Sequence, residues 1–219
     1  TIALGLLAKA DKDEALAIGH SSLANQENAI AVGQDAQATG RGGVALGNAT
    51  RSVQNAFAAA WDAQANGKGA VAVGTGTRAT QENSSAVGSG AQATGGNATA
   101  IGYNSKAVTG NDTAVGSGVT ASGGASTMIG YNSTVTGNQA FGGGSGLSVA
   151  GGGSVGLGYN SSTTSDKSIA IGHTTKATQA NTVAIGASAT AAGLNSIAMG
   201  NSSSITAPTA GTTVGGQDS

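Results

Sequence analysis

The chain has 219 residues, of which 9% are charged and 3% aromatic, with 39 glycines and a formal net charge of −1. Ordinary soluble domains carry about 25% charged residues and roughly 7% glycine, so this composition disfavours helix, because each interior glycine costs a helix about 1 kcal/mol. Near-neutral charge indicates no nucleic-acid partner, and the absence of cysteine excludes disulfides and zinc–thiolate sites.

A short repeat runs from Thr1 to about Ile205, and it has a period of fourteen residues. Each repeat closes a short apolar stretch on an anchor residue, which is glycine in every repeat but one, as in Asn181–Gly186. The interval that ends at Ala60 is one residue short, which predicts a tightened loop near Gln54 and Asn55. A fixed period over the chain predicts a solenoid, in which each repeat buries its apolar face only against its neighbours.

Two columns of the repeat, one and three residues before the anchor, are rich in β-branched residues such as Val183 and Ile185. β-Branched residues favour strands over helices, and residues two apart in a strand share a face. We therefore expect these columns to form the core. The column between them is nearly all alanine, as at Ala184, which suggests an outward face that lies against another backbone, in a second subunit or a covering layer.

A second strand is predicted a few residues past each anchor. Small residues three and five positions past the anchor, such as Ala36 and Ala38, should face inward, and the residue between them, such as Gln37, should face solvent. Asparagines and glycines seven to nine positions past the anchor indicate turns with positive φ. The glycine-rich stretches 141–144 and 150–153 should weaken the core, and residues 206–219 are expected to be an irregular exit segment.

The repeat resembles the YadA-like head of bacterial trimeric autotransporter adhesins, over about residues 1–205. The resemblance rests on units such as Asn195–Gly200, on Gly-Tyr-Asn-Ser at 102–105 and 130–133, and on Ile-Gly-His at 18–20. It implies an all-β, left-handed parallel β-roll that forms a homotrimer at the cell surface, carried by a stalk and by a C-terminal outer-membrane anchor that are missing here. It also implies a role in adhesion and virulence, through binding of host matrix proteins such as collagen or fibronectin, or through self-association between cells in autoagglutination and biofilm.

The column directly after the anchor holds every tyrosine, tryptophan and histidine of the chain. Large aromatic side chains there could cap the core or pack on a neighbouring subunit, or they could anchor a protein ligand. Asn195 and Ser196 open the unit that is most similar to the collagen-binding repeats of the family. The candidate ligand or subunit contacts are therefore Trp61, Tyr103, Tyr131, Tyr159, Asn195 and Ser196.

No enzyme site is expected. His20 and His173 lie eleven repeats apart, so they cannot share a site within one chain. The acidic cluster Asp11, Asp13 and Glu14 is read as a solvated turn, and the glycine-rich loops lack the context of phosphate-binding loops, so neither a metal nor a cofactor is predicted. A left-handed β-helix acyltransferase fits the period poorly. A non-adhesive structural solenoid or an ice-binding solenoid remains the alternative, although ice binding needs a flat rank of threonines, and Arg51, Arg78, Lys106 and Lys176 interrupt the solvent column.

Overall fold

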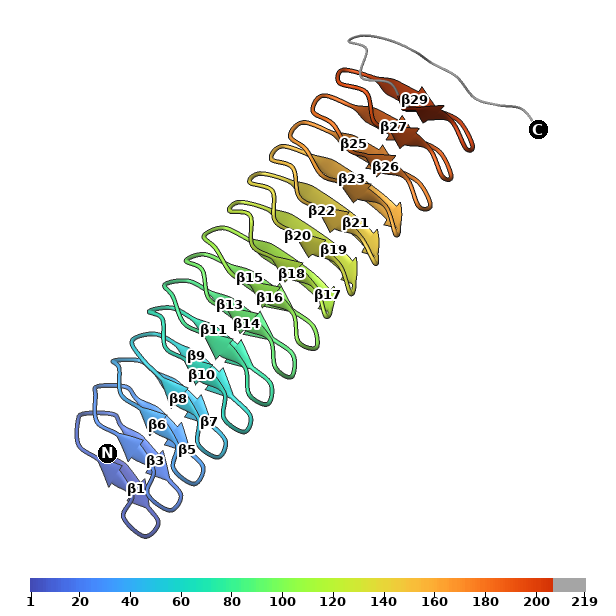
Figure 1. Cartoon of the computed structure of the whole chain (residues 1–219). Coiled ribbons are helices and arrows are strands. Elements are labelled where there is room, and N and C mark those ends of the chain that lie inside the picture. Colours follow the sequence, from blue (N-terminus) through green and yellow to red (C-terminus); the bar gives the residue numbers. More distant parts are fainter. Residues whose placement is uncertain (207–219) are drawn as a thin grey trace. The chain divides into compact units, whose positions relative to one another are not determined.

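A computed structural model describes residues 1–206, in which every regular element is a β-strand. Each repeat forms one coil of two short strands, and successive coils stack through parallel pairing (Figure 1). The odd-numbered strands form one sheet, which we call sheet A, and the even-numbered strands form sheet B. The predicted all-β parallel β-roll is therefore confirmed.

Two compact units divide the chain, residues 1–110 and 111–219. The first unit contains the coils from β1 to β16. Its sheet A strands are β1 Ile2–Leu4, β3 Leu16–Ile18, β5 Ile30–Val32, β7 Val44–Leu46, β9 Phe57–Ala59, β11 Val71–Val73, β13 Ser85–Val87 and β15 Thr99–Ile101. Its sheet B strands are β2 Lys9–Ala10, β4 Leu23–Ala24, β6 Gln37–Ala38, β8 Arg51–Ser52, β10 Gln64–Ala65, β12 Arg78–Ala79, β14 Gln92–Ala93 and β16 Lys106–Ala107.

The second unit contains the coils from β17 to β30. Its sheet A strands are β17 Thr113–Ser117, β19 Thr127–Tyr131, β21 Phe141–Ser145, β23 Val155–Tyr159, β25 Ile169–Ile171, β27 Val183–Ile185 and β29 Ile197–Met199. Its sheet B strands are β18 Thr120–Ala121, β20 Thr134–Val135, β22 Ser148–Val149, β24 Ser162–Thr163, β26 Lys176–Ala177, β28 Thr190–Ala191 and β30 Ser204–Ile205. The exit segment predicted from residue 206 onward falls outside the described residues except for its first residue.

The interior of the roll is made of small side chains, and this reverses the predicted core. The alanines at the centre of the sheet A strands, such as Ala17, Ala31 and Ala184, have no exposed surface, whereas their neighbours Ile18 and Ile185 are only half-buried. In most coils the two sheets lie so close that only methyl- or hydroxyl-sized groups lie between them; larger buried side chains, among them Met128 and Leu147, occur in the second unit. The large apolar residues therefore point outward. Of the two covers expected for the alanine column, the structure shows the covering layer of the same chain, which is sheet B, and the reading of this column as a subunit interface is wrong.

Sheet B agrees with the sequence-based prediction. Ala36 and Ala38 are fully buried and Gln37 between them lies on the outer surface. Several buried hydroxyls three residues past an anchor donate to its carbonyl oxygen, as from Thr77 Oγ1 to Gly74 at 2.8 Å and from Ser22 Oγ to Gly19 at 3.0 Å. These bonds satisfy polar groups that would otherwise be costly to bury, so serine and threonine can take the place of alanine in the interior.

Glycine is needed at the anchors and in the loops for different reasons. Anchor glycines such as Gly88 have φ of +119°, and a Cβ there would lie 2.7 Å from the carbonyl oxygen of Gly102 in the next coil. Loop glycines such as Gly67 were expected to supply positive φ, but Gly67 lies outside that region; a Cβ on it would instead collide with the backbone of Gln81. The predicted positive φ is found at the loop asparagines, including Asn181 and Asn195, both at 57°.

Irregular coils keep the register by local adjustment. The coil of thirteen residues loses its residue from the loop between β8 and β9, and Val44 still pairs with Phe57. The glycine-rich coils do not leave the interior empty, contrary to expectation, because Met128 and Leu147 fill the space beside Gly142. Glycine at one position and a large side chain in the neighbouring coil thus replace the usual alanine pair.

A buried carboxylate closes one loop of the second unit. Asp112 has no exposed surface, and its Oδ1 accepts hydrogen bonds from the backbone N–H of Gly124 and Ser126, both at 3.0 Å, and from Ser126 Oγ at 2.8 Å. The sequence showed Asp112 only as an exception in a column of small residues. Its structural role is to satisfy three donors in the next coil.

We expect Asp112→Ala to lower the free energy of unfolding by about 3 kcal/mol, because three donors, two of them in buried bonds, would lose their acceptor. Chemical denaturation followed by circular dichroism measures this change. Asp166→Ala is the control, since Asp166 Oδ1 accepts one exposed bond, from Gly152 N at 2.8 Å, and should cost far less. Equal losses in the two variants would contradict the role assigned to Asp112.

Candidate functional site: the outer face of sheet A

The outer surface of sheet A is an apolar face, which we define as the side chains of the first and third residues of each sheet A strand. In the first unit, Val44 and Leu46 are half-buried and Ile101 is 42% exposed; in the second unit, Ile129 is 46% exposed. Monomeric proteins seldom expose contiguous apolar patches of more than a few hundred Å². A rank of valine, isoleucine and leucine that repeats coil after coil therefore indicates a surface that another molecule covers.

Large and small residues compensate each other on this face. Where the first residue of a strand becomes phenylalanine, the third becomes the smallest available, as in Phe57 with Ala59 and Phe141 with Gly143. Phe141 leans toward Gly143, since a Cβ on Gly143 would lie 3.6 Å from Phe141 Cε1. This exchange keeps the height of the face even. Such evenness matters for packing against a second surface and has little value for a face left in water.

The polar part of the apolar face lies toward the middle of the sequence. The first residue of the strand is hydroxylic in β13, β15, β17 and β19, while the third residue stays Val87, Ile101, Val115 and Ile129. A covering partner therefore meets weaker apolar contact there than at Ile169 and Ile171 or at Val183 and Ile185.

The aromatic residues lie at the margin of this face. The strands β17, β19, β21 and β23 continue two residues further than the others, so that Tyr131 and Tyr159 follow the alternation of the apolar face. Trp61 is 59% exposed, Tyr103 61%, Tyr131 62% and Tyr159 51%. These side chains do not cap the interior of their own chain, so the first of the two predicted structural roles is not observed.

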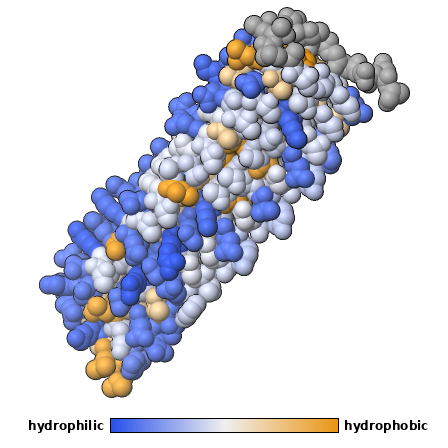
Figure 2. All heavy atoms as spheres, viewed as in Figure 1, coloured by the Kyte–Doolittle hydropathy of each residue, from blue (hydrophilic) through white to orange (hydrophobic). Residues whose placement is uncertain are grey.

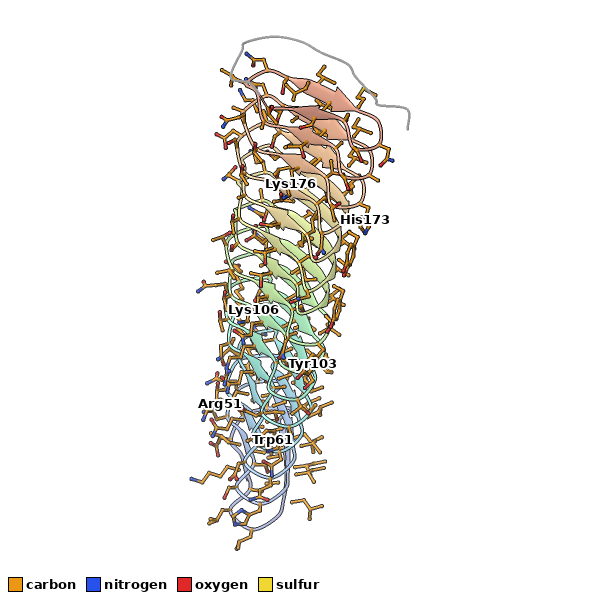
Figure 3. The ribbon with its side chains drawn as sticks, turned by 45° about the vertical axis from the view of Figure 1, so that its right-hand side comes forward. Arg51, Trp61, Tyr103, Lys106, His173 and Lys176 are labelled. Atoms are coloured by element: carbon orange, nitrogen blue, oxygen red, sulfur yellow. The ribbon has the colours of Figure 1, made fainter. Side chains whose placement is uncertain are left out.

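Tyr159 stacks on His173, which follows it by one coil, with ring centroids 5.1 Å apart and an interplanar angle of 21°. This tyrosine–histidine pair was not predicted, because the sequence shows only that the two residues occupy the same column one repeat apart. Figure 3 shows His173 projecting from the edge of the ribbon. The pair makes a partly exposed aromatic surface in the second unit.

Asn195 and Ser196 occupy different environments. Asn195 lies on an exposed loop and its Oδ1 accepts a hydrogen bond from Asn181 Nδ2 at 3.1 Å, so the two asparagines form a pair between neighbouring coils. Ser196 is 1% exposed and its side chain lies inside the roll. Of this predicted pair, only Asn195 is therefore available at the surface of this chain.

The described residues contain no group of three or more histidine, cysteine or acidic side chains that could hold a metal ion. Among residues 1–206 there is also no helix of the length and apolar character needed to span a membrane. The geometry provides a repetitive outer surface, in which apolar, aromatic and polar residues occupy separate columns.

The fold is thus a parallel β-roll with a fourteen-residue repeat and an outward apolar face, which defines the class of repetitive β-solenoids. The family model described as YadA head domain repeat (2 copies) matches residues 1–22, 24–50, 65–91, 93–118, 150–175 and 177–203. The chain belongs to this family, as its resemblance predicted. The unmatched stretches include the shortened coil and the coils with Met128, Leu147 and Gly142.

Among solved structures, the chain is similar to the collagen-binding domain of the Yersinia adhesin YadA, at 25% sequence identity with a TM-score of 0.23. The similarity covers 77% of this chain and 64% of that chain, so this chain corresponds to less than two thirds of that domain. A search of curated proteins found no match.

Proposed function

We propose that this chain is the head of a trimeric adhesin displayed at a bacterial cell surface and held there by an outer-membrane anchor. Membership of the YadA head family supports an adhesive role. The observation that supports the trimer is the apolar face, whose repeated valines and isoleucines are left uncovered by residues 1–206. A homotrimer covers it with two further copies of the same surface.

In the trimer each surface feature would be present in three copies around the common axis, and similar features would recur from coil to coil along each chain. Linked weak sites raise the apparent affinity without any new type of contact, which suits adhesion to a repetitive matrix protein such as collagen, to fibronectin, or to the heads of a neighbouring cell. The proposed function involves no reaction, cofactor or metal. The alternative is a structural or ice-binding solenoid, and a thermal-hysteresis assay would reveal ice binding.

We propose that Trp61, Tyr103, Tyr131 and Tyr159, together with Asn195, contribute contacts to a ligand or to a neighbouring subunit. Their support is the exposure of four aromatic side chains beside the apolar face. Exposed tyrosine and tryptophan are favoured anchors of protein interfaces. Ser196 is left out of this proposal because it is buried.

We expect the double variant Tyr131→Ser with Tyr159→Ser to bind its matrix ligand at least about tenfold more weakly, since truncation of each aromatic anchor costs about 1 kcal/mol or more. Serine is the natural residue at this column in the intervening coil, at Ser145, so the fold should tolerate it. The measurement is binding to immobilised collagens and fibronectin, with autoagglutination of displaying cells beside it. Asn160→Ser is the neighbouring control.

An unchanged affinity in the double variant, with the oligomer intact, would remove the tyrosines from the ligand site. Loss of the oligomer in the same variant would assign them to the subunit interface instead. Absence of binding to every protein of the panel, together with absence of autoagglutination, would contradict the adhesin function itself.

A further inference from the structure

The outer surface of sheet B in the first unit carries a row of alternating amide and cationic side chains. The residues at the first position of successive strands, from β6 to β16, are Gln37, Arg51, Gln64, Arg78, Gln92 and Lys106. The register pairs each with the next, for example Gln64 with both Arg51 and Arg78. We call these six residues the Gln–cation row.

The three cations of this row are exposed, and the amides between them are half-buried. Because parallel strands lie about 4.8 Å apart, cations on alternate strands are spaced by roughly 10 Å. In Figure 3, Arg51 and Lys106 lie toward one side of the ribbon and Tyr103 nearer the other. The row is on the sheet opposite the apolar face, so it stays accessible when that face is covered.

The composition of the row argues against a purely structural role. Cross-strand neighbours of opposite charge stabilise a sheet, and like charges on adjacent strands destabilise it. Alternation of arginine with glutamate would therefore serve stability best, yet the intervening residues are all glutamine. The parallel column two residues further on, from Thr39 to Val108, is also uncharged. The row is left with positive charge and amide donors and with no carboxylate of its own.

The column two residues before the row holds two carboxylates, Asp35 and Asp62, of which Asp62 contacts the row. Asp62 Oδ1 accepts a hydrogen bond from Gln64 Nε2 at 2.9 Å, and Asp62 Oδ2 lies 3.8 Å from Arg78. Arg51 and Lys106 form no ion pair among the described residues, where the other pair joins Arg41 and Glu27 at 3.2 Å. The ion pair between Arg78 and Asp62 is long and partly exposed, so an anion that binds Arg78 more strongly can replace Asp62.

We propose that the Gln–cation row binds a linear sulfated polysaccharide along the axis of the first unit. Sulfate groups on such a chain recur with its saccharide repeat, so successive sulfates can meet successive cations, while glutamine amides donate to the sulfate, carboxylate and hydroxyl oxygens between them. Nucleic acid fits less well, since its phosphates recur about every 3.4 Å along each strand and most would face no cation.

The second unit provides an internal contrast. The same column there reads Thr120, Thr134, Ser148, Ser162, Lys176, Thr190 and Ser204. Figure 2 shows strongly hydrophilic side chains over the visible face of the first unit, whereas the visible face of the second is mostly of intermediate hydropathy. An isolated lysine in a column of hydroxyls lacks the spacing of the row, so Lys176 serves as a matched control.

The test measures binding of the whole chain to immobilised heparin as the probe, over a range of salt concentrations. The triple variant Arg51→Gln, Arg78→Gln and Lys106→Gln should bind on the order of tenfold more weakly, because each exposed ion pair contributes little and three are lost. Glutamine already occupies the alternate strands, so the fold should be kept. Lys176→Gln should bind as the unchanged chain does.

Asp62→Asn should strengthen binding by about two- to threefold, since it frees Arg78 of a weak surface ion pair. Asparagine suits the positive φ of 52° at this position. A damaged fold cannot give such a gain, which separates this outcome from misfolding. Moving one charge, by Gln64→Arg with Arg78→Gln, keeps the net charge but breaks the spacing and should weaken binding.

Three results would overturn the proposal. The first is unchanged heparin binding in the triple variant, and the second is an equal loss with Lys176→Gln. The third is equal affinity for desulfated heparin or for a single-stranded oligonucleotide, which would show a general response to negative charge. The proposal is independent of the matrix ligand, because the tyrosine variants leave the Gln–cation row unchanged and should keep their affinity for heparin.

Discussion

Ile185→Lys is expected to convert a trimer into single chains. Ile185 lies on the apolar face in β27, beside Val183, where the face is uniformly apolar. A lysine there would place an ammonium group without a partner in each copy of the interface, and burial of an unpaired charge costs several kcal/mol. Analytical ultracentrifugation should give three times the mass of one chain for the unchanged protein and the mass of one chain for the variant.

The matched control is Thr190→Lys, which adds the same charge one strand later on the outer surface of sheet B, where Lys176 naturally occupies the preceding coil. It should remain trimeric. A monomeric unchanged chain well above micromolar concentration, or dissociation of the control to the same extent as Ile185→Lys, would show that the apolar face is not the subunit interface.

The loss of the trimer should also weaken adhesion far more than the removal of any one contact. Three copies of a surface act as linked sites, whose combined affinity exceeds each single affinity by orders of magnitude. Binding measured for Ile185→Lys on a dense collagen or fibronectin surface would therefore fall steeply, while the circular dichroism of the roll stays the same.

The period, the strand positions and the turn asparagines could be predicted because they follow from backbone geometry. A positive φ at Asn181 and strands that end at glycine anchors leave direct marks in the sequence. Which face of the sheet A strands is buried could not be predicted from the sequence. An alternating strand shows that Ala184 and Ile185 face opposite sides, but not which side is inner.

The usual rule, that the larger apolar residue is buried in its own chain, predicted that Ile185 lies inside and Ala184 outside, and the structure shows the reverse. Here sheet B of the same chain lies over the alanine side, so the central alanines of the sheet A strands have no exposed surface. The alternation of the strand does not reveal on which side the returning chain will lie. The isoleucines are left on the outer surface, so the error that placed them in the core also assigned the alanines to a subunit interface.

In the candidate site, too, some features could be predicted from the sequence and others could not. The shared column of Tyr103, Tyr131 and Tyr159 was evident, and so was the solvent position of Arg51. The stack of Tyr159 on His173 and the contact of Asp62 with Arg78 were not, because they depend on side-chain directions between coils. Contacts one repeat apart appear in the sequence only as identical columns, without any sign of which members touch.

The second large effect is expected inside the roll. Ala184→Met should lower the free energy of unfolding by about 3 kcal/mol or more, because overpacking of a dense interior costs about 1–3 kcal/mol and more where the backbone cannot yield. Ala184 is fully buried and pairs with Ala198 in the next coil. The control Ile185→Met changes the adjacent residue on the outer face, where Met199 is the natural residue one coil later, and should cost less than about 1.5 kcal/mol.

The chain itself suggests how this loss can be reversed. Met128 occupies the equivalent inner position of β19, and the residue that pairs with it in the next coil is Gly142. A Cβ on Gly142 would collide with Met128 Sδ and lie 3.2 Å from Leu147 Cδ2, so the methionine fits only because its neighbour is glycine. We expect Ala198→Gly to restore part of the stability lost in Ala184→Met, although alone it should destabilise the chain.

Denaturation curves of the two single variants and the double variant measure this coupling. A favourable coupling energy of about 1 kcal/mol or more would show that volume is exchanged between neighbouring coils inside the roll. Simple additivity would instead mean that the sheets move apart to admit the methionine. In that case the restriction to small interior residues would come from the alanines that happen to be present, and the outward position of the isoleucines would need a different cause.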